Sequence, residues 1–420
     1  MKNKIVKRRL DEQAKVFTLV SNPKYCSVFR FTVILKENVE KDILQDAYSG
    51  ALEKYKALKV KLKCGIYEYY LEENKNDVVI FKLDKEPTIK KINNKENNDY
   101  LIKVMFCKNE IYFDFYHALT DGTTAIRFIK DIISRYLEIK YSSVLESKYL
   151  NDNTSIIKYD DPYKLSKKYE KVNYKFSEGI RISGTSIKND EVIMEHFSID
   201  VNELKELSKN KELTITMFMT SVIAYTFYRL LYKNSDKKRP INLCIPISLN
   251  KYFDVETLSN FFSHMFVSLE LKEKDDYTFE EISGFVKSQF ENNIKLEKIM
   301  GVVNSNSTKM NNIVLKCIPL CVKKIAFVLG SLKMKKQFSM TVSNVGKIEF
   351  DKQYEDYIEN AYVTLSCDWA ERVKCGMSSY KDKFIITFCR NIVEEDFIIE
   401  FKNILDENKL KYFIFNNKEE

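Results

Sequence analysis

A histidine, an aspartate and a glycine stand close together in the segment HALTDG, residues 117–122. His117 is one of only 3 histidines in the 420-residue chain. A neutral imidazole with a pKa near 6.5 can accept a proton from a hydroxyl, an amine or a thiol at neutral pH. The segment therefore makes His117 a candidate general base, with Asp121 and Gly122 as candidates for shaping the loop around it.

The flanking residues indicate how this histidine would be positioned. Residues 111–117 read IYFDFYH, in which alternate apolar side chains and His117 share one face of a predicted strand. From residue 123 the apolar residues recur with helical spacing, so Asp121 and Gly122 form the predicted turn between strand and helix. A purely structural role stays open, because Asp is a good helix N-cap and Asp-Gly is a common turn.

The chain divides into two similar halves. Each half opens with a strand pattern, continues with helical spacing and returns to a strand pattern, from SVFRFTVILKENV in the first half and EVIMEHFSIDV in the second. The predicted organisation is an N-terminal lobe over residues 1–150, a polar crossing linker over 151–190 and a C-terminal lobe over 191–420. The predicted fold class is α/β, with mixed sheets in two similar lobes.

Composition excludes several classes of protein. The net charge is +8, but 68 basic residues face 60 acidic ones and lack the basic stripe expected of a nucleic-acid-binding protein. The 9 cysteines lack zinc-site spacing, and the first residues lack the apolar core of a secretory leader. We therefore expect reduced thiols, a cytoplasmic location and no metal site.

Two apolar stretches have the length of helices. Residues 216–232 are short for a membrane span and predict a buried core helix. Residues 313–336 are interrupted by Lys316, Pro319 and Lys323, which predicts a core-packed helix pair with a basic outer face. Peripheral membrane contact is an open alternative for this second stretch.

The segment around His117 resembles the His-His-x-x-x-Asp-Gly signature of the chloramphenicol acetyltransferase-like superfamily. That superfamily includes plant acyltransferases, nonribosomal peptide condensation domains and bacterial alcohol acetyltransferases. The segment looks most like the stand-alone alcohol acetyltransferase-like proteins of low-GC bacteria. Tyr116 replaces the first histidine of the signature, and His117 matches the second, which is the catalytic one in the superfamily.

Three further stretches, in chain order, extend the resemblance from about residue 25 to about residue 405. KYKALKVKLK places Lys59 where the family has the basic partner of the signature aspartate, usually an arginine. IPISLNKYFDVETLSNFF places Asn260 on a family asparagine, while Asn250 replaces a family arginine. FSMTVSNVGKIEF resembles the strand beside the family's tunnel and contributes Ser343 and Asn344.

The resemblance implies two lobes in a V with a central tunnel, where an acyl-coenzyme A co-substrate and a small-molecule acceptor meet. It implies His117 as the general base and an Asp121–Lys59 pair that holds the loop. Gly122 would let the chain turn without a side chain in the channel. Candidates for oxyanion or tunnel contacts are Ser343, Asn344 and Asn260. No tightly bound cofactor is implied.

Two alternatives stay open at this level. The chain resembles condensation-type enzymes too, which would take thioesters from a carrier protein, and it could be a catalytically silent binding protein of the same fold. Other polar residues are weaker candidates. We expect His196 and His264 to be core or edge residues, and neither Cys367 nor Cys375 has a neighbouring histidine in sequence to activate a thiol.

Overall fold

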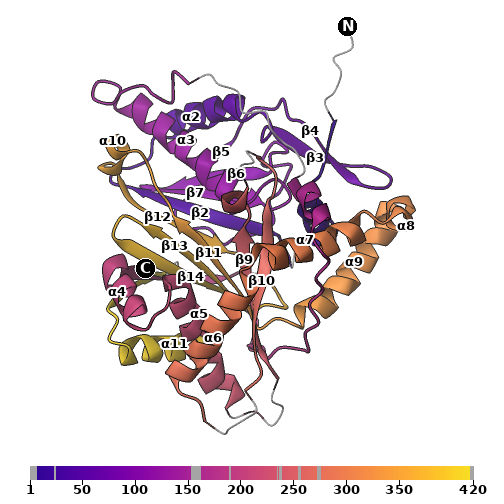
Figure 1. Cartoon of the computed structure of the whole chain (residues 1–420). Helices are drawn as coiled ribbons and strands as arrows, with labels where there is room; N and C mark the ends of the chain where they lie inside the picture. Colours follow the sequence, from indigo (N-terminus) through magenta and orange to yellow (C-terminus); the bar gives the residue numbers. More distant parts are fainter. Residues whose placement is uncertain are drawn as a thin grey trace.

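The computed structural model describes residues 7–22, 25–152, 162–188, 191–233, 235, 239–253, 257–271 and 276–416. Two mixed α/β lobes are built on a five-stranded sheet of order β12-β2-β7-β6-β5 and a seven-stranded sheet of order β10-β9-β11-β13-β14-β8-β15. A three-stranded sheet of order β1-β4-β3 extends from the first lobe (Figure 1). The predicted two-lobe α/β fold class is confirmed.

The elements of the first half are, in chain order, β1 (Lys7–Arg9), α1 (Glu12–Val20), β2 (Val28–Leu35), α2 (Lys41–Lys54), β3 (Val60–Cys64), β4 (Tyr69–Glu73), β5 (Ile80–Lys82), β6 (Ile102–Cys107), β7 (Glu110–Tyr116) and α3 (Gly122–Lys140). The 3-10 helix η1 (Pro162–Lys168) follows within the predicted linker. Its Tyr163 is buried in the core of the C-terminal lobe. Residues 153–161 and 189–190 of that linker lie outside the described residues.

The elements of the second half are β8 (Ile193–Asp200), α4 (Val201–Asn210), α5 (Ile215–Phe227), the π-helix η3 (Tyr228–Tyr232), β9 (Ile241–Ser248), η4 (Asn250–Tyr252), β10 (Phe262–Leu269), α6 (Phe279–Asn293), α7 (Leu296–Met310), α8 (Ile313–Cys317), α9 (Leu320–Lys335), β11 (Met340–Lys347), α10 (Lys352–Glu355), β12 (Ile358–Leu365), β13 (Val373–Tyr380), β14 (Lys383–Arg390), α11 (Asp396–Glu407) and β15 (Tyr412–Asn416). In Figure 1, α4, α5, α6 and α11 gather at the lower end of this lobe.

The strand that leads to His117 is held at the centre of the first sheet. β7 pairs antiparallel with β2 and β6, and Phe113 stands opposite Phe31 in the pairing with β2. Both phenylalanines are buried in a core that α2 and α3 complete. Arg30 and Asp114, also opposite each other in this pairing, form a buried ion pair with Nε–Oδ1 at 2.6 Å. Each buried charge therefore has its partner directly across the ladder.

One strand from the last quarter of the chain completes the first sheet. β12 pairs antiparallel with β2, with Val363 opposite Phe31. After residues 366–372 the chain enters β13, which belongs to the seven-stranded sheet. Ile348, Phe350 and Ile358 join the core of the N-terminal lobe. By sequence, β12 lies within the predicted C-terminal lobe, residues 191–420. Its pairing with β2 places it in the sheet of the N-terminal lobe. The period of a strand shows its buried face and not its partner.

The apolar stretches of the second half behave differently from each other. Residues 216–232 lie in α5 and η3, where Phe218, Val222 and Phe227 are fully buried, so the predicted core helix is confirmed. Residues 313–336 form the predicted helix pair, α8 and α9. The expected core packing of this pair is wrong, because Ile325 is 64% exposed and Leu329 60% exposed.

The described part of the chain lacks two features. None of its helices combines the length and the apolar character that a membrane span requires. The same residues contain no cluster of His, Cys, Asp and Glu suited to a metal ion.

The crossing strand generates a test of lobe autonomy. A fragment of residues 1–150 should lack cooperative unfolding, because it leaves the β2 edge unpaired and removes Ile348, Phe350 and Ile358 from its core. Fusing residues 348–366 to this fragment through a flexible linker should restore part of that cooperativity. Urea unfolding followed by circular dichroism measures both. A monomeric fragment 1–150 that unfolds cooperatively would contradict this role of β12.

Candidate active site

His117 lies directly after the last residue of β7. Its backbone N–H donates a hydrogen bond to the Ser27 carbonyl at 2.8 Å, which prolongs the pairing of β7 with β2. Five residues later α3 begins, with Asp121 as its N-cap. The strand, the turn and the helix that the sequence predicts around this histidine are all present.

Three phenylalanines from different elements surround the His117 ring. Phe17 of α1 stacks on it with ring centroids 4.2 Å apart, Phe29 of β2 meets it edge-on at 4.8 Å, and Phe262 of β10 lies 5.3 Å away. This apolar surrounding disfavours the charged imidazolium and lowers the pKa of His117 to about 4. The ring is therefore neutral at neutral pH.

A hydrogen-bond chain through Asn260 orients that neutral ring. His117 Nδ1 lies 3.1 Å from Asn260 Oδ1, while Asn260 Nδ2 donates to Asp11 Oδ2 at 3.0 Å. The Asp11 carboxylate also accepts from the Asn260 backbone N–H at 3.1 Å, so the amide nitrogen must face Asp11 and the amide oxygen must face the ring. The proton of His117 is then on Nδ1, and Nε2 carries the free lone pair.

This geometry generates a spectroscopic prediction. In wild-type protein, His117 should titrate near pH 4 and should carry its proton on Nδ1 above that pH. Nitrogen-15 NMR of the imidazoles measures both properties, and the chain has only 3 histidines to assign. A His117→Gln variant identifies the signal by its loss. A His117 pKa near the ordinary 6.5, or a proton on Nε2, would contradict the described environment.

Asp121 connects the turn to the other lobe. Its Oδ1 accepts from the Thr124 N–H at 3.1 Å and its Oδ2 from the Phe261 N–H at 2.9 Å. The carboxyl is buried, and desolvation raises its pKa, while these backbone hydrogen bonds act in the opposite direction. Because Phe261 leads into β10, one side chain ties the start of α3 to the C-terminal lobe.

The expected pair between Asp121 and Lys59 is wrong. The Lys59 ammonium instead forms an ion pair with Glu53 at the end of α2. The Asp121 carboxylate instead accepts the backbone N–H groups of Thr124 and Phe261, one at each oxygen. The resemblance to the family motif predicted a basic residue at position 59. The position of its side chain depends on the loop between α2 and β3, which places it beside Glu53.

The role of Asp121 can be tested through stability. Asp121→Ala should lower the free energy of unfolding by about 2–4 kcal/mol, because it removes an N-cap and leaves the buried N–H of Phe261 without an acceptor. Lys59→Ala is the matched control and should cost no more than about 1 kcal/mol, since its ion pair is largely exposed. Urea unfolding measures both. Equal losses for the two variants would contradict the backbone role of Asp121.

Gly122 is the first residue of α3 and lies beside β11. A Cβ atom there would be 3.5 Å from Val345 Cγ1, which is an ordinary contact distance. Its φ is not positive, so the turn does not depend on glycine, and that part of the expectation is wrong. The short distance between Gly122 and Val345 shows that β11, the strand that carries Ser343 and Asn344, lies close to the loop of His117.

The remaining predicted residues lie around this point. Ser343 and Asn344 are half-buried, and neither hydrogen-bonds to His117. Asn344 accepts from the Gly346 N–H at 2.9 Å and donates to Thr216 Oγ1 at 2.9 Å. Asn250 is the first residue of η4, two residues after the end of β9. Of the predicted set, Asn260 is the residue that forms a side-chain hydrogen bond with the His117 ring.

The sequence did not indicate the positions of three residues near the site: Asp11, Phe17 and His264. Asp11 and Phe17 come from α1, and the one available signal was an aspartate before an apolar helical run, which is typical of an N-cap. His264 is half-buried beside Phe262, with ring centroids 5.3 Å apart, so Phe262 separates two imidazoles. His196 is fully buried and contacts Thr387 Oγ1 at 2.9 Å, as expected of a core residue.

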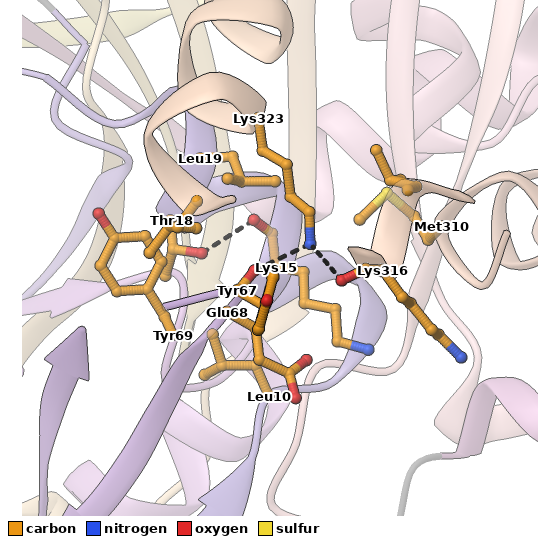
Figure 2. Close-up of a pocket in the computed structure, with 12 residues that line it drawn as sticks. Leu10, Lys15, Thr18, Leu19, Tyr67, Glu68, Tyr69, Met310, Lys316 and Lys323 are labelled. Carbon is orange, nitrogen blue, oxygen red and sulfur yellow. Dashed lines mark hydrogen bonds between the residues drawn. The ribbon is translucent and has the colours of Figure 1, made fainter. Parts of the chain in front are cut away.

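Two pockets of the structure lie away from His117. The first is bounded by α1, the β3–β4 hairpin and the α8–α9 segment, and Figure 2 shows the Lys323 amine inside it. α1 therefore turns Phe17 toward His117 and turns Lys15, Thr18 and Leu19 toward this pocket. The residues that line the second pocket include three arginines and the single tryptophan: Arg181, Arg239, Arg372 and Trp369.

The chain is similar to known proteins in structure and not in sequence. No protein-family model matches the chain, and no curated protein matches its sequence. Polyketide synthase associated protein 5 from Mycobacterium tuberculosis is similar in structure, with a TM-score of 0.64, 13% identity, and coverage of 95% of this chain and 97% of that one. Trichothecene 15-O-acetyltransferase from Fusarium sporotrichioides has a TM-score of 0.63 at 9% identity, covering 97% and 95%.

A third similar structure is a mutant starter condensation domain of rhizomide synthetase in complex with C8-CoA and Leu-SNAC. Its TM-score is 0.62 at 10% identity, covering 96% of this chain and 94% of that one. At these identities the likeness concerns the fold and not the chemistry. The chain thus has, over nearly its whole length, the two-lobed fold shared by these acetyltransferase and condensation-domain structures.

Proposed function

We propose that this protein is an acyltransferase that moves an acyl group, with acetyl as the simplest case, from a coenzyme A thioester to a small-molecule alcohol or related nucleophile. The observation that carries the proposal is the neutral His117 ring, whose Nδ1 is bound to Asn260. That contact leaves the Nε2 lone pair available to a substrate proton. The shared two-lobed fold supports the same class of reaction.

The reaction follows from the properties of that ring. Nε2 takes the acceptor's hydroxyl proton as the hydroxyl oxygen attacks the thioester carbonyl. The tetrahedral intermediate collapses, the carbon–sulfur bond breaks, and the imidazolium returns its proton to the departing thiolate. A pKa near 4 keeps the ring unprotonated before substrates bind and makes the imidazolium a ready proton donor to sulfur.

The other named residues act on the ring or on the oxyanion. Asn260 and Asp11 hold the tautomer, as in other sites where a second group orients a general base. Ser343 and Asn344 are the proposed oxyanion or tunnel contacts, since β11 lies against the loop of His117. Asp121 holds the two lobes together at this point.

A carrier-protein thioester is the second candidate donor. The rhizomide synthetase domain, a condensation domain, has this fold and was seen with an acyl-coenzyme A and an aminoacyl thioester analogue. The proposed chemistry at His117 is the same for both donors, because each presents a thioester carbonyl. Donor identity therefore has to be measured, and a protein that only binds such ligands would show no turnover with either.

The direct test is turnover of acetyl- and octanoyl-coenzyme A against alcohols and amines, with products identified by mass spectrometry. His117→Ala should lower the rate by about a hundred- to ten-thousandfold, the usual contribution of a general base. His264→Ala is the matched control, because it removes the other half-buried imidazole beside Phe262. It should retain at least a tenth of the wild-type rate.

Ester formation that survives in His117→Ala would contradict the assignment of the base. Absence of product from any coenzyme A donor, with turnover of an acylated carrier protein, would favour the condensation-type candidate. Absence of turnover with both donors would favour a binding protein.

A further inference from the structure

The α8–α9 segment and the adjacent hairpin tip expose an unusual amount of apolar surface. We call this surface the α8–α9 face. Its large exposed side chains are Ile66 and Tyr67 of the β3–β4 hairpin, Ile313 and Val314 of α8, and Val322, Ile325, Leu329 and Met334 of α9. Half of the large exposed hydrophobic residues found in the described part of the chain belong to this one face. Such concentration marks an interaction site.

The spacing along α9 explains why these side chains point outward together. Val322, Ile325 and Leu329 are separated by three and four residues, so they form one row along a helix. Leu320 and Lys323 are buried toward the opposite side. α9 is thus an amphipathic helix whose apolar row faces solvent, in a segment that protrudes at the right of Figure 1.

Hydrogen bonds join the hairpin to this helix. The Leu320 N–H donates to the Ile66 carbonyl at 2.8 Å, and Lys323 Nζ donates to the Tyr67 carbonyl at 2.8 Å. Figure 2 shows this lysine between the hairpin and the Lys316 carbonyl. The hairpin tip is therefore held directly beside the start of α9.

Positive charge is concentrated in the same segment. Residues 313–336 contain six lysines and no acidic residue, whereas the net charge of the whole chain is +8. Lys316, Lys333 and Lys336 are exposed and Lys324 is half-buried. The helix pair therefore combines exposed aliphatic side chains with positive charge.

We propose that the α8–α9 face binds the surface of a lipid bilayer that contains anionic lipids. The aliphatic row would enter the boundary between headgroups and acyl chains, and the lysines would lie at the level of the lipid phosphates. A second copy of the chain fits less well, because identical faces would oppose their lysines. The α8–α9 segment protrudes from the molecule, which lets a lipid surface reach it (Figure 1). The inference does not depend on the proposed acyl transfer.

Vesicle flotation with the full chain tests the proposal. The protein should float with vesicles of equal amounts of phosphatidylglycerol and phosphatidylcholine, and it should stay behind with phosphatidylcholine alone. Raised salt should weaken the binding, because it screens the lysines. The variant Lys333→Gln with Lys336→Gln removes two exposed cations and should weaken partitioning about thirtyfold.

The apolar contribution is tested separately. Ile325→Gln with Leu329→Gln keeps the charge and should weaken partitioning at least about tenfold, through lost apolar burial. The matched control is Ile399→Gln with Lys205→Gln, which changes one exposed aliphatic residue and one exposed lysine on α11 and α4. It should bind vesicles as the wild type does. Thermal unfolding verifies that every variant is folded.

Three outcomes would overturn the proposal. The first is no flotation with the anionic vesicles, and the second is wild-type binding by both face variants. The third is binding to a protein instead of to vesicles, either to an acidic acyl carrier protein or to a second copy of the chain. Light scattering would detect the self-association, and the face variants would lose the binding. That result would assign the face to a protein partner.

Discussion

The arrangement of the candidate site depends on one buried carboxylate that belongs to both lobes. A carboxylate removed from water must find hydrogen-bond donors, and Asp121 finds them at the first turn of α3 and at the Phe261 N–H before β10. Asn260 precedes Phe261, and His117 lies four residues before Asp121. The hydrogen bonds of Asp121 therefore fix both the contact between the lobes and the position of Asn260 beside the His117 ring.

The ring of His117 is oriented by a neutral amide and not by a charge. If Asp11 contacted the imidazole directly, its negative charge would favour the imidazolium and raise the pKa of His117. Asn260 lies between them. Asp11 orients the Asn260 amide, the amide orients the His117 ring, and the carboxylate does not touch the ring. Desolvation by Phe17, Phe29 and Phe262 then dominates, and the pKa falls to about 4. The site therefore favours an imidazole that is neutral at neutral pH.

The α8–α9 face follows the opposite logic, because it leaves apolar side chains in water. By contrast, α5 places its apolar side chains, among them Phe218 and Val222, in the core of the C-terminal lobe. α9 instead packs through Leu320 and Lys323 and turns Ile325 and Leu329 away from the protein. An exposed aliphatic row lowers solubility unless something covers it, and this is the basis for the proposed lipid contact of the helix pair.

The sequence by itself determined the local chemistry: a histidine at the end of a strand, an aspartate that caps the next helix, and α/β lobes. These features depend on neighbours in the chain, and periodicity reports them. Tertiary structure alone decided that Asp121 binds Phe261, that Lys59 binds Glu53, that Asp11 acts through Asn260 and that β12 joins the first sheet. Each joins separate elements, or, for Lys59, depends on how a loop folds back. It also decided that α9 is apolar toward solvent, because a helical period shows which residues share a face and not what covers that face.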